Sequence, residues 1–307
     1  MTFNRVLFVS RGLGNDEDAL RNAMTLAQEA EFGLDVLVIV PTLPAKLLSY
    51  SQQLIDNALE AYQQMLEKVQ RDLPLASRVS VSSMQAHDAS TTAIKRVLQD
   101  DYDLLVKQAE TKNNEIGFMS VDLDLLRKCP CPVLLCRPGH QINQGKVAVA
   151  VDPNAKDQVE LSLSKKLLRL STALTSASQK PTELVACWDF TLENTLTNGT
   201  WLSMSTTQLS NEKREAEQES LDNLKRMIKA SGCKQTFNIN HLEGFPFVKV
   251  PEFTELETID LLVMGTVART GMSSFFIGNT AENILQSLSC SLLAVKPVGF
   301  VSPVTVD

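Results

Sequence analysis

The sequence predicts an α/β protein made of two tandem domains, each a doubly wound parallel sheet of five strands. Three observations support this prediction. The 307 residues suit two domains of ordinary size. The chain contains one internal repeat, and in each copy short apolar runs alternate with amphipathic stretches. Short, continuously apolar strands that alternate with helices are typical of a parallel sheet covered on both faces.

The repeat is visible in two separate segments. Asp103-Leu104-Leu105-Val106 recurs as Asp260-Leu261-Leu262-Val263, and LLRKCPCPVLLCRP is echoed by ILQSLSCSLLAVKP. RVLFVSRG near the start is the counterpart of KVAVAVDP. We therefore expect a first domain over residues 1–140 and a second over residues 146–300, joined by the polar stretch GHQINQGK.

The first copy opens with the apolar run Val6–Ser10, which is too short for a helix and is expected to be a strand. A helix is expected from Asn15, because the acids that follow suit the positive end of the helix dipole, and Gly33 is expected to end it. The other expected elements are strands over 34–40, 79–84, 104–106 and 133–136 and helices over 46–70, 91–98 and 123–127.

The second copy repeats this order. It is expected to contain strands over 147–151, 184–188, 237–240, 261–264 and 292–295, and helices over 156–176, 210–230, 248–256 and from 280. In such sheets ligands bind beyond the carboxyl ends of the strands, where the strand order reverses. The loop after strand 261–264 is expected to lie there.

Composition excludes several classes of protein. An apolar fraction of 44% with 21% charged residues is typical of a soluble globular chain. The net charge of −7 argues against nucleic-acid binding, which needs a basic face. No apolar run reaches the roughly 18 residues of a membrane span, and the start is not a signal peptide. We expect a cytoplasmic protein with reduced cysteines.

Two kinds of chemistry receive little support. Cys129, Cys131, Cys136 and His140 have the spacing C-x-C-x4-C-x3-H, which lacks the usual zinc knuckle, so buried thiols are favoured over a metal site. None of the three histidines lies in a catalytic motif, and no Walker lysine follows the glycine-containing loop. We therefore predict no catalytic residues and no enzyme; a slow ATPase in the second domain is the alternative.

DLLVMGTVART, IGNTAENIL and SLLAVKP in the second copy resemble the universal stress protein family, specifically its tandem-domain, UspE-type members. The resemblance covers nearly the whole chain as two family domains in series. It implies the adenine nucleotide alpha hydrolase-like fold and a non-enzymatic binding and regulatory role in stress. It also implies that the last strands, 133–136 and 292–295, pair within one molecule, with a homodimer as the alternative.

The ATP-binding branch of that family carries G-x2-G-x9-G-[ST], for which this chain has Gly265, Ala268, Gly278 and Asn279. Glycine lets backbone amides approach phosphate, and the helix N-terminus favours an anion. Ala268 costs on the order of 1–2 kcal/mol if a left-handed conformation is required. Asn279 is expected to cap the last helix, with Glu282 as its capping-box partner, which would leave the amides no need of phosphate.

The resemblance implies a candidate ATP or AMP site in the second domain alone. The candidate nucleotide-binding residues are Asp152, Gly265, Thr266, Arg269, Gly278, Asn279 and Thr280. Asp152 matches the adenine-contacting aspartate of ATP-binding relatives, or is a turn residue before Pro153. Trp188, where those relatives have a small residue, is interpreted together with Ala268 as pocket-filling; core packing or stacking on a planar ligand are the alternatives. The alternative for the whole loop is a turn without a nucleotide, in a scaffold that acts through its surfaces.

The first copy has lost the motif. Gln108 replaces the first glycine, Met119-Ser120 replaces the last pair, and Arg11 stands in place of the aspartate. Asp122 and Asp124 are expected within the first turn or so of the next helix, where they satisfy the dipole and repel phosphate. We predict no nucleotide in this domain.

One long polar segment, Thr191–Ser210, contains Trp201, Leu202 and Met204. Ordinary loop packing is the favoured interpretation, and a pocket cover or a docking segment is the alternative.

Overall fold

The computed structural model describes residues 3–12, 16–28, 30–73, 78–110, 116–142, 144–175, 180–190, 205–266 and 278–306. The first half contains β1 (Val6–Ser10), α1 (Glu17–Leu26), β2 (Leu34–Pro41), the 3-10 helix η1 (Ala45–Tyr50), α2 (Ser51–Asp72), β3 (Val79–Ala86), α3 (Ala89–Asp100), β4 (Leu104–Gln108), α4 (Ser120–Lys128) and β5 (Val133–Cys136). The second half contains β6 (Val147–Val151), α5 (Gln158–Thr175), β7 (Thr182–Trp188), α7 (Thr206–Ser231), β8 (Phe237–Glu243), α8 (Pro246–Leu256), β9 (Leu261–Gly265), α9 (Asn279–Ser287) and β10 (Ser291–Val295).

The sheet lies between two layers of helices, which confirms the predicted fold class. Alternate side chains of β1 show the division: Phe8 packs on the face covered by α1, α2, α5 and α7, and Leu7 on the face covered by α3, α4, α8 and α9. Each predicted strand and helix is present in the expected order, with boundaries moved by a few residues. Within the described residues no helix combines the length and apolarity that crossing a membrane requires.

The predicted end of the first helix is wrong. Gly33 does not end the first helix, because α1 already ends at Leu26. Gly33 instead precedes β2 with a φ of +77°, and a Cβ on it would lie 2.2 Å from the carbonyl oxygen of Arg78. The glycine is therefore required by a left-handed turn and by the close approach of the chain before β3.

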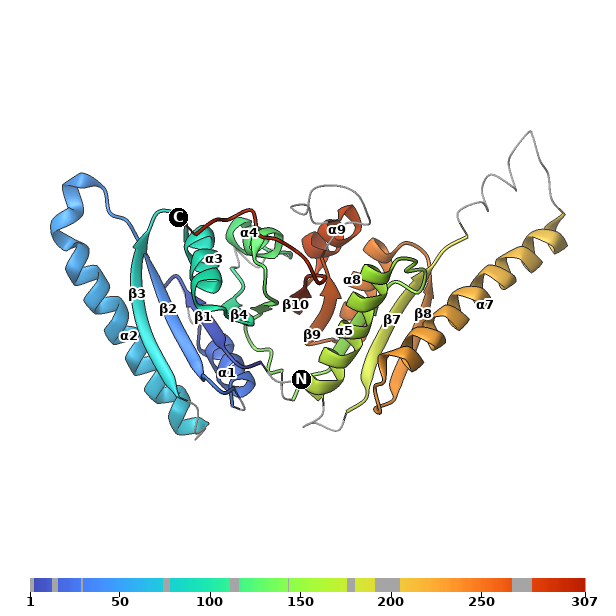
Figure 1. The fold of residues 1–307 in the computed structure, drawn as a ribbon, viewed down its shortest axis with the longest axis horizontal. Helices are drawn as coiled ribbons and strands as arrows, with labels where there is room; N and C mark the ends of the chain where they lie inside the picture. The colour runs from blue at the N-terminus through green and yellow to red at the C-terminus, as the bar shows by residue number, and fades with distance from the viewer. Residues whose placement is uncertain are drawn as a thin grey trace.

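The strands form one continuous sheet in the order β3-β2-β1-β4-β5-β10-β9-β6-β7-β8. Figure 1 shows the two halves side by side, with α2 and α7 at opposite ends. Strands within each half are parallel, and β5 and β10 join the halves as antiparallel neighbours, with Leu135 opposite Leu292. The two sheets expected from the sequence are thus merged through their last strands. In each half the strand order reverses between the first and fourth strands, β1 and β4 or β6 and β9.

The antiparallel junction of β5 and β10 is the seam between the two halves. Equivalent basic residues follow these two strands and donate hydrogen bonds across the seam. Arg137 donates through Nη2 to the carbonyl oxygens of Gly117 and Leu288, the latter at 3.1 Å and at the end of α9. Lys296 donates from Nζ to the carbonyl oxygen of Leu126 in α4 at 2.5 Å. Both cations are 5% exposed, so each half buries a charge against the last helix of the other half.

Lys296 makes stability depend on pH. Burial lowers the pKa of its ammonium group from 10.5 to about 8. Between these values the unfolded chain binds more protons than the folded chain, so the free energy of unfolding rises with pH through this window. We expect wild type to gain roughly 3 kcal/mol relative to Lys296→Met between pH 7.5 and 10.5. Urea unfolding measures this difference, and parallel pH curves for the two proteins would contradict it.

Candidate functional site

The second half brings several predicted residues to one edge of the sheet. Asp152 directly follows β6, Gly265 ends β9, and Thr266 comes next. Because β6 and β9 are hydrogen-bonded parallel neighbours, with Val149 opposite Val263, their carboxyl ends meet where the strand order reverses. Gly278, Asn279 and Thr280 begin α9, which follows β9 in the chain. Arg269 and Ala268 lie outside the described residues.

The predicted cap of α9 is wrong. Gly278 is the N-cap, with an extended backbone at φ −62° and ψ 144°, and Asn279 is already the first helical residue. The carboxylate of Glu282 does not return to the N-cap, because it pairs with Arg127 of α4 across the seam. Within the described part of the chain the first turn of α9 receives no side-chain cap. Its amide groups therefore stay suited to an anion.

Thr266 adds an independent feature. The residue is fully buried, and its Oγ1 has no hydrogen-bond partner among the described residues. A buried hydroxyl without a partner costs about 1–3 kcal/mol, so such groups are uncommon in native proteins. Its neighbour Gly265 has a packing role, since a Cβ there would lie 2.7 Å from Cδ2 of Leu163.

Asp152 and Trp188 both take part in the local structure. Oδ1 of Asp152 accepts the backbone N–H of Asn154 at 2.9 Å, as a turn residue does. Trp188 is 5% exposed and stacks on His241 with ring centroids 6.0 Å apart. Burial lowers the pKa of that histidine, whose Nε2 lies 3.0 Å from the hydroxyl of Ser220. The roles predicted for Asp152 and Trp188 toward a ligand stay predictions.

A groove of about 910 Å³ adjoins the turn after Asp152. It is lined by the β6–α5 loop, α5 and the second half of α7, including Lys156, Lys165 and Arg226. Neither Thr266 nor the start of α9 lines it. The groove and the switch point between β6 and β9 are therefore two separate features.

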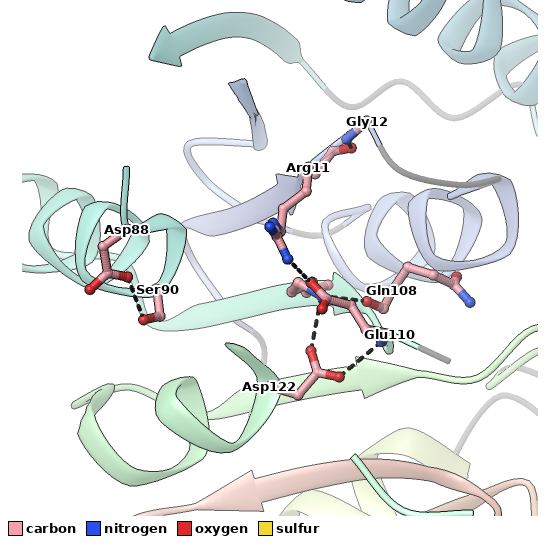
Figure 2. A network of polar contacts seen from close by, with 9 residues as sticks. Arg11, Gly12, Asp88, Ser90, Gln108, Glu110 and Asp122 are labelled. Atoms are coloured by element: carbon pink, nitrogen blue, oxygen red, sulfur yellow. Dashed lines mark hydrogen bonds and ion pairs between the residues drawn. The ribbon is translucent and has the colours of Figure 1, made fainter. Parts of the chain in front are cut away.

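The first half fills its own switch point with charged side chains (Figure 2). Lys107 of β4 donates from Nζ to Oδ1 of Asp122 in α4 at 2.9 Å, and the N–H of Glu110 donates to Oδ2 of Asp122 at 2.9 Å. Arg11, after β1, pairs with the carboxylate of Glu110 at 2.7 Å. Asp122 is fully buried; burial raises its pKa, whereas Lys107 and the Glu110 N–H lower it.

The same positions in the second half are apolar. By the repeat, Lys107 corresponds to Met264 and Asp122 to Ala281, and both of these are buried. Asp124, expected near the start of α4, lies beyond its first turn and pairs with Lys128 at 3.0 Å. Among the described residues, the two halves thus differ: an ion pair lies at the first switch point, whereas the corresponding positions of the second, Met264 and Ala281, are apolar.

Lys107 and Glu110 are not among the residues predicted from the sequence. The sequence did contain a signal, since Lys107 directly continues the apolar run of the strand predicted over 104–106. In the structure Lys107 is only 3% exposed. A charged residue that continues a buried strand indicates an internal ion pair.

Among the described residues no three His, Cys, Asp or Glu side chains gather to hold a metal, and Sγ of Cys129 lies 3.6 Å from Sγ of Cys131 in the core.

Two doubly wound halves, each with a reversal of strand order between its first and fourth strands, define a tandem α/β protein. The chain belongs to the universal stress protein family, whose sequence profile matches residues 2–137 and 146–296. Membership supports a role in the stress response.

Curated relatives match this chain over most of its length. The universal stress protein E homolog of Haemophilus influenzae is 28% identical over 315 residues, 97% of this chain and 98% of that protein. Universal stress protein E of Photorhabdus laumondii is 30% identical over 221 residues, which cover 69% of this chain and 67% of that protein. These matches support a tandem protein of the universal stress protein E type.

Solved structures agree on the fold. A Pseudomonas aeruginosa protein has a TM-score of 0.71 at 23% identity, covering 96% of this chain and 93% of its own. A universal stress protein from Archaeoglobus fulgidus has a TM-score of 0.61 at 14% identity, and the match covers 95% of this chain and 98% of that protein.

Proposed function

We propose that this protein is a non-enzymatic stress-response regulator whose second domain binds ATP, AMP or a related small phosphate compound. The site lies at the carboxyl ends of β6 and β9, with the phosphate at the start of α9. The single observation that carries this proposal is the hydroxyl of Thr266, fully buried beside the switch point and without a partner in the described part of the chain.

The uncapped first turn of α9 supports the same site, because it offers backbone donors close in sequence to Gly278. Asp152 is assigned to the adenine, or to its equivalent in another ligand. Arg269 is assigned to the phosphate by its place in the loop sequence. The chain is proposed to act as a cytoplasmic module, and homodimerisation is a further proposal.

Thr266→Val separates a binding hydroxyl from a structural one. Without ligand the variant should be about 1 kcal/mol more stable, because it removes a buried hydroxyl that has no partner. Binding of ATP or AMP should weaken about tenfold, or about 1.4 kcal/mol. Titration calorimetry with and without magnesium measures affinity, and urea unfolding measures stability. Thr172→Val, in which the lost hydroxyl donates to the Arg169 carbonyl oxygen at 3.0 Å, is the matched control.

The proposed nucleotide site can be contradicted by two measurements on wild type. If wild type gives no heat with millimolar nucleotide, and native mass spectrometry finds no co-purified small molecule, the second-domain site is wrong. Ala268→Gly restores the missing motif glycine and should tighten binding. If its affinity is unchanged, the alanine does not limit the site.

A further inference from the structure

The first-half switch point holds a carboxylate in the way that a protein holds a bound anion. Oε1 of Glu110 lies 2.7 Å from Nη1 of Arg11 and 3.2 Å from Nζ of Lys107. The two cations come from the ends of β1 and β4, the strands that flank the reversal of strand order. Figure 2 shows Arg11 directed toward Glu110 between these elements. One oxygen of the chain itself therefore occupies a two-cation cradle.

The two carboxylates of this network differ in their freedom to leave. Asp122 is fully buried and accepts from both Lys107 and the Glu110 N–H, so it is fixed. The side chains of Glu110 and Arg11 are 24% and 32% exposed, so they reach solvent. The hydrogen bond from the Glu110 N–H anchors the backbone while its side chain can rotate outward.

Asp16 is another charged residue near the network, and it lies on the opposite face of the sheet, with Tyr62. Its carboxylate accepts from the hydroxyls of Ser10 and Tyr62, so it does not compete for the cations directly. Although burial opposes it, Lys107 and Arg11 lower the pKa of Glu110, which keeps this group an anion at neutral pH. An anion that takes the place of Glu110 therefore restores a negative charge beside the two cations.

We propose that Arg11 and Lys107 form a second, small-oxyanion site in the first domain, and that the Glu110 carboxylate is its tethered occupant. A phosphate group, free or carried by a small metabolite, replaces this carboxylate, which turns to solvent. The tether makes Glu110 a competitor at high local concentration, so the site opens only when phosphate is abundant. This inference stands apart from the second-domain nucleotide site.

The test is to measure the affinity of the full chain for inorganic phosphate by titration calorimetry at constant ionic strength. Glu110→Gln removes the competing charge and should bind phosphate about tenfold tighter than wild type. Adding Arg11→Gln should abolish that gain. Glu252→Gln, which frees Lys249 from a 3.0 Å ion pair in the second domain, is the control for net charge and should match wild type.

The proposal is overturned if Glu110→Gln binds phosphate no tighter than wild type, or if the gain survives Arg11→Gln. AMP in place of phosphate identifies the source: equal gains mean that a phosphoryl group on a larger compound is accepted, and a gain for phosphate alone restricts the site to the free anion. If Glu110→Gln does not fold, the test is thermal unfolding of wild type and of Arg11→Gln with phosphate or chloride. Phosphate must then raise the Tm of wild type more than chloride at equal ionic strength, and Arg11→Gln must remove this difference.

Discussion

Asp122→Ala is expected to lower the free energy of unfolding by about 3–5 kcal/mol, the range for removing one partner of a buried ion pair. The reason is that Nζ of Lys107, on a side chain only 4% exposed, loses the carboxylate 2.9 Å away. The Glu110 N–H loses its acceptor at the same time. Urea unfolding followed by circular dichroism measures the change.

The second half supplies the control for this prediction. Met264 and Ala281 stand where the first half has Lys107 and Asp122. Lys107→Met combined with Asp122→Ala therefore transplants a pair that the same fold already tolerates. The double variant should be more stable than Asp122→Ala, with a coupling of about 2 kcal/mol or more. Additive losses from the two single variants would show that the ion pair does not act as a unit.

These two positions also show what sequence can and cannot predict about the site. The loss of the motif in the first domain can be read directly from Gln108, Met119-Ser120 and Arg11, and the carboxylates of Asp122 and Asp124 are predicted near the start of the next helix. The partner was not found, because Lys107 and Asp122 lie on β4 and α4 and meet only when the helix packs on the sheet. The sequence alone suggests only a local role for Asp122, which is its interaction with the helix dipole.

The fold was more accessible than the site because its signal is local. Each buried strand is a short apolar run, so type and order were predicted correctly for both halves. Gly33 and Asn279 were misassigned for one reason: each is a typical terminal residue of a helix, but tertiary contacts decide where the helix ends. Gly33 is needed by the approach of Arg78, and the partner expected for Asn279, Glu282, is held by Arg127 across the seam.

Arg137→Met is expected to lower the free energy of unfolding by about 2–4 kcal/mol, because hydrogen bonds from a charged group are each worth about 1.5–3 kcal/mol. The guanidinium is buried, donates to carbonyl oxygens on both halves, and lies 4.6 Å over the ring of Phe118. Methionine keeps much of the apolar stem but none of these donors. The lost hydrogen bonds connect the two halves across the seam, so the halves should also unfold less cooperatively.

Arg127→Gln is the matched control, since it too removes an arginine that crosses the seam. Its ion pair with Glu282 is about one-third exposed on each side, and exposed pairs contribute about 0–1 kcal/mol. Differential scanning calorimetry of both variants distinguishes the two contacts. A broadened or split transition in Arg137→Met with a single sharp one in Arg127→Gln would place the coupling of the halves on the buried guanidinium. Indistinguishable transitions would mean that pairing of β5 with β10 is sufficient without it, and that Arg137 adds only packing.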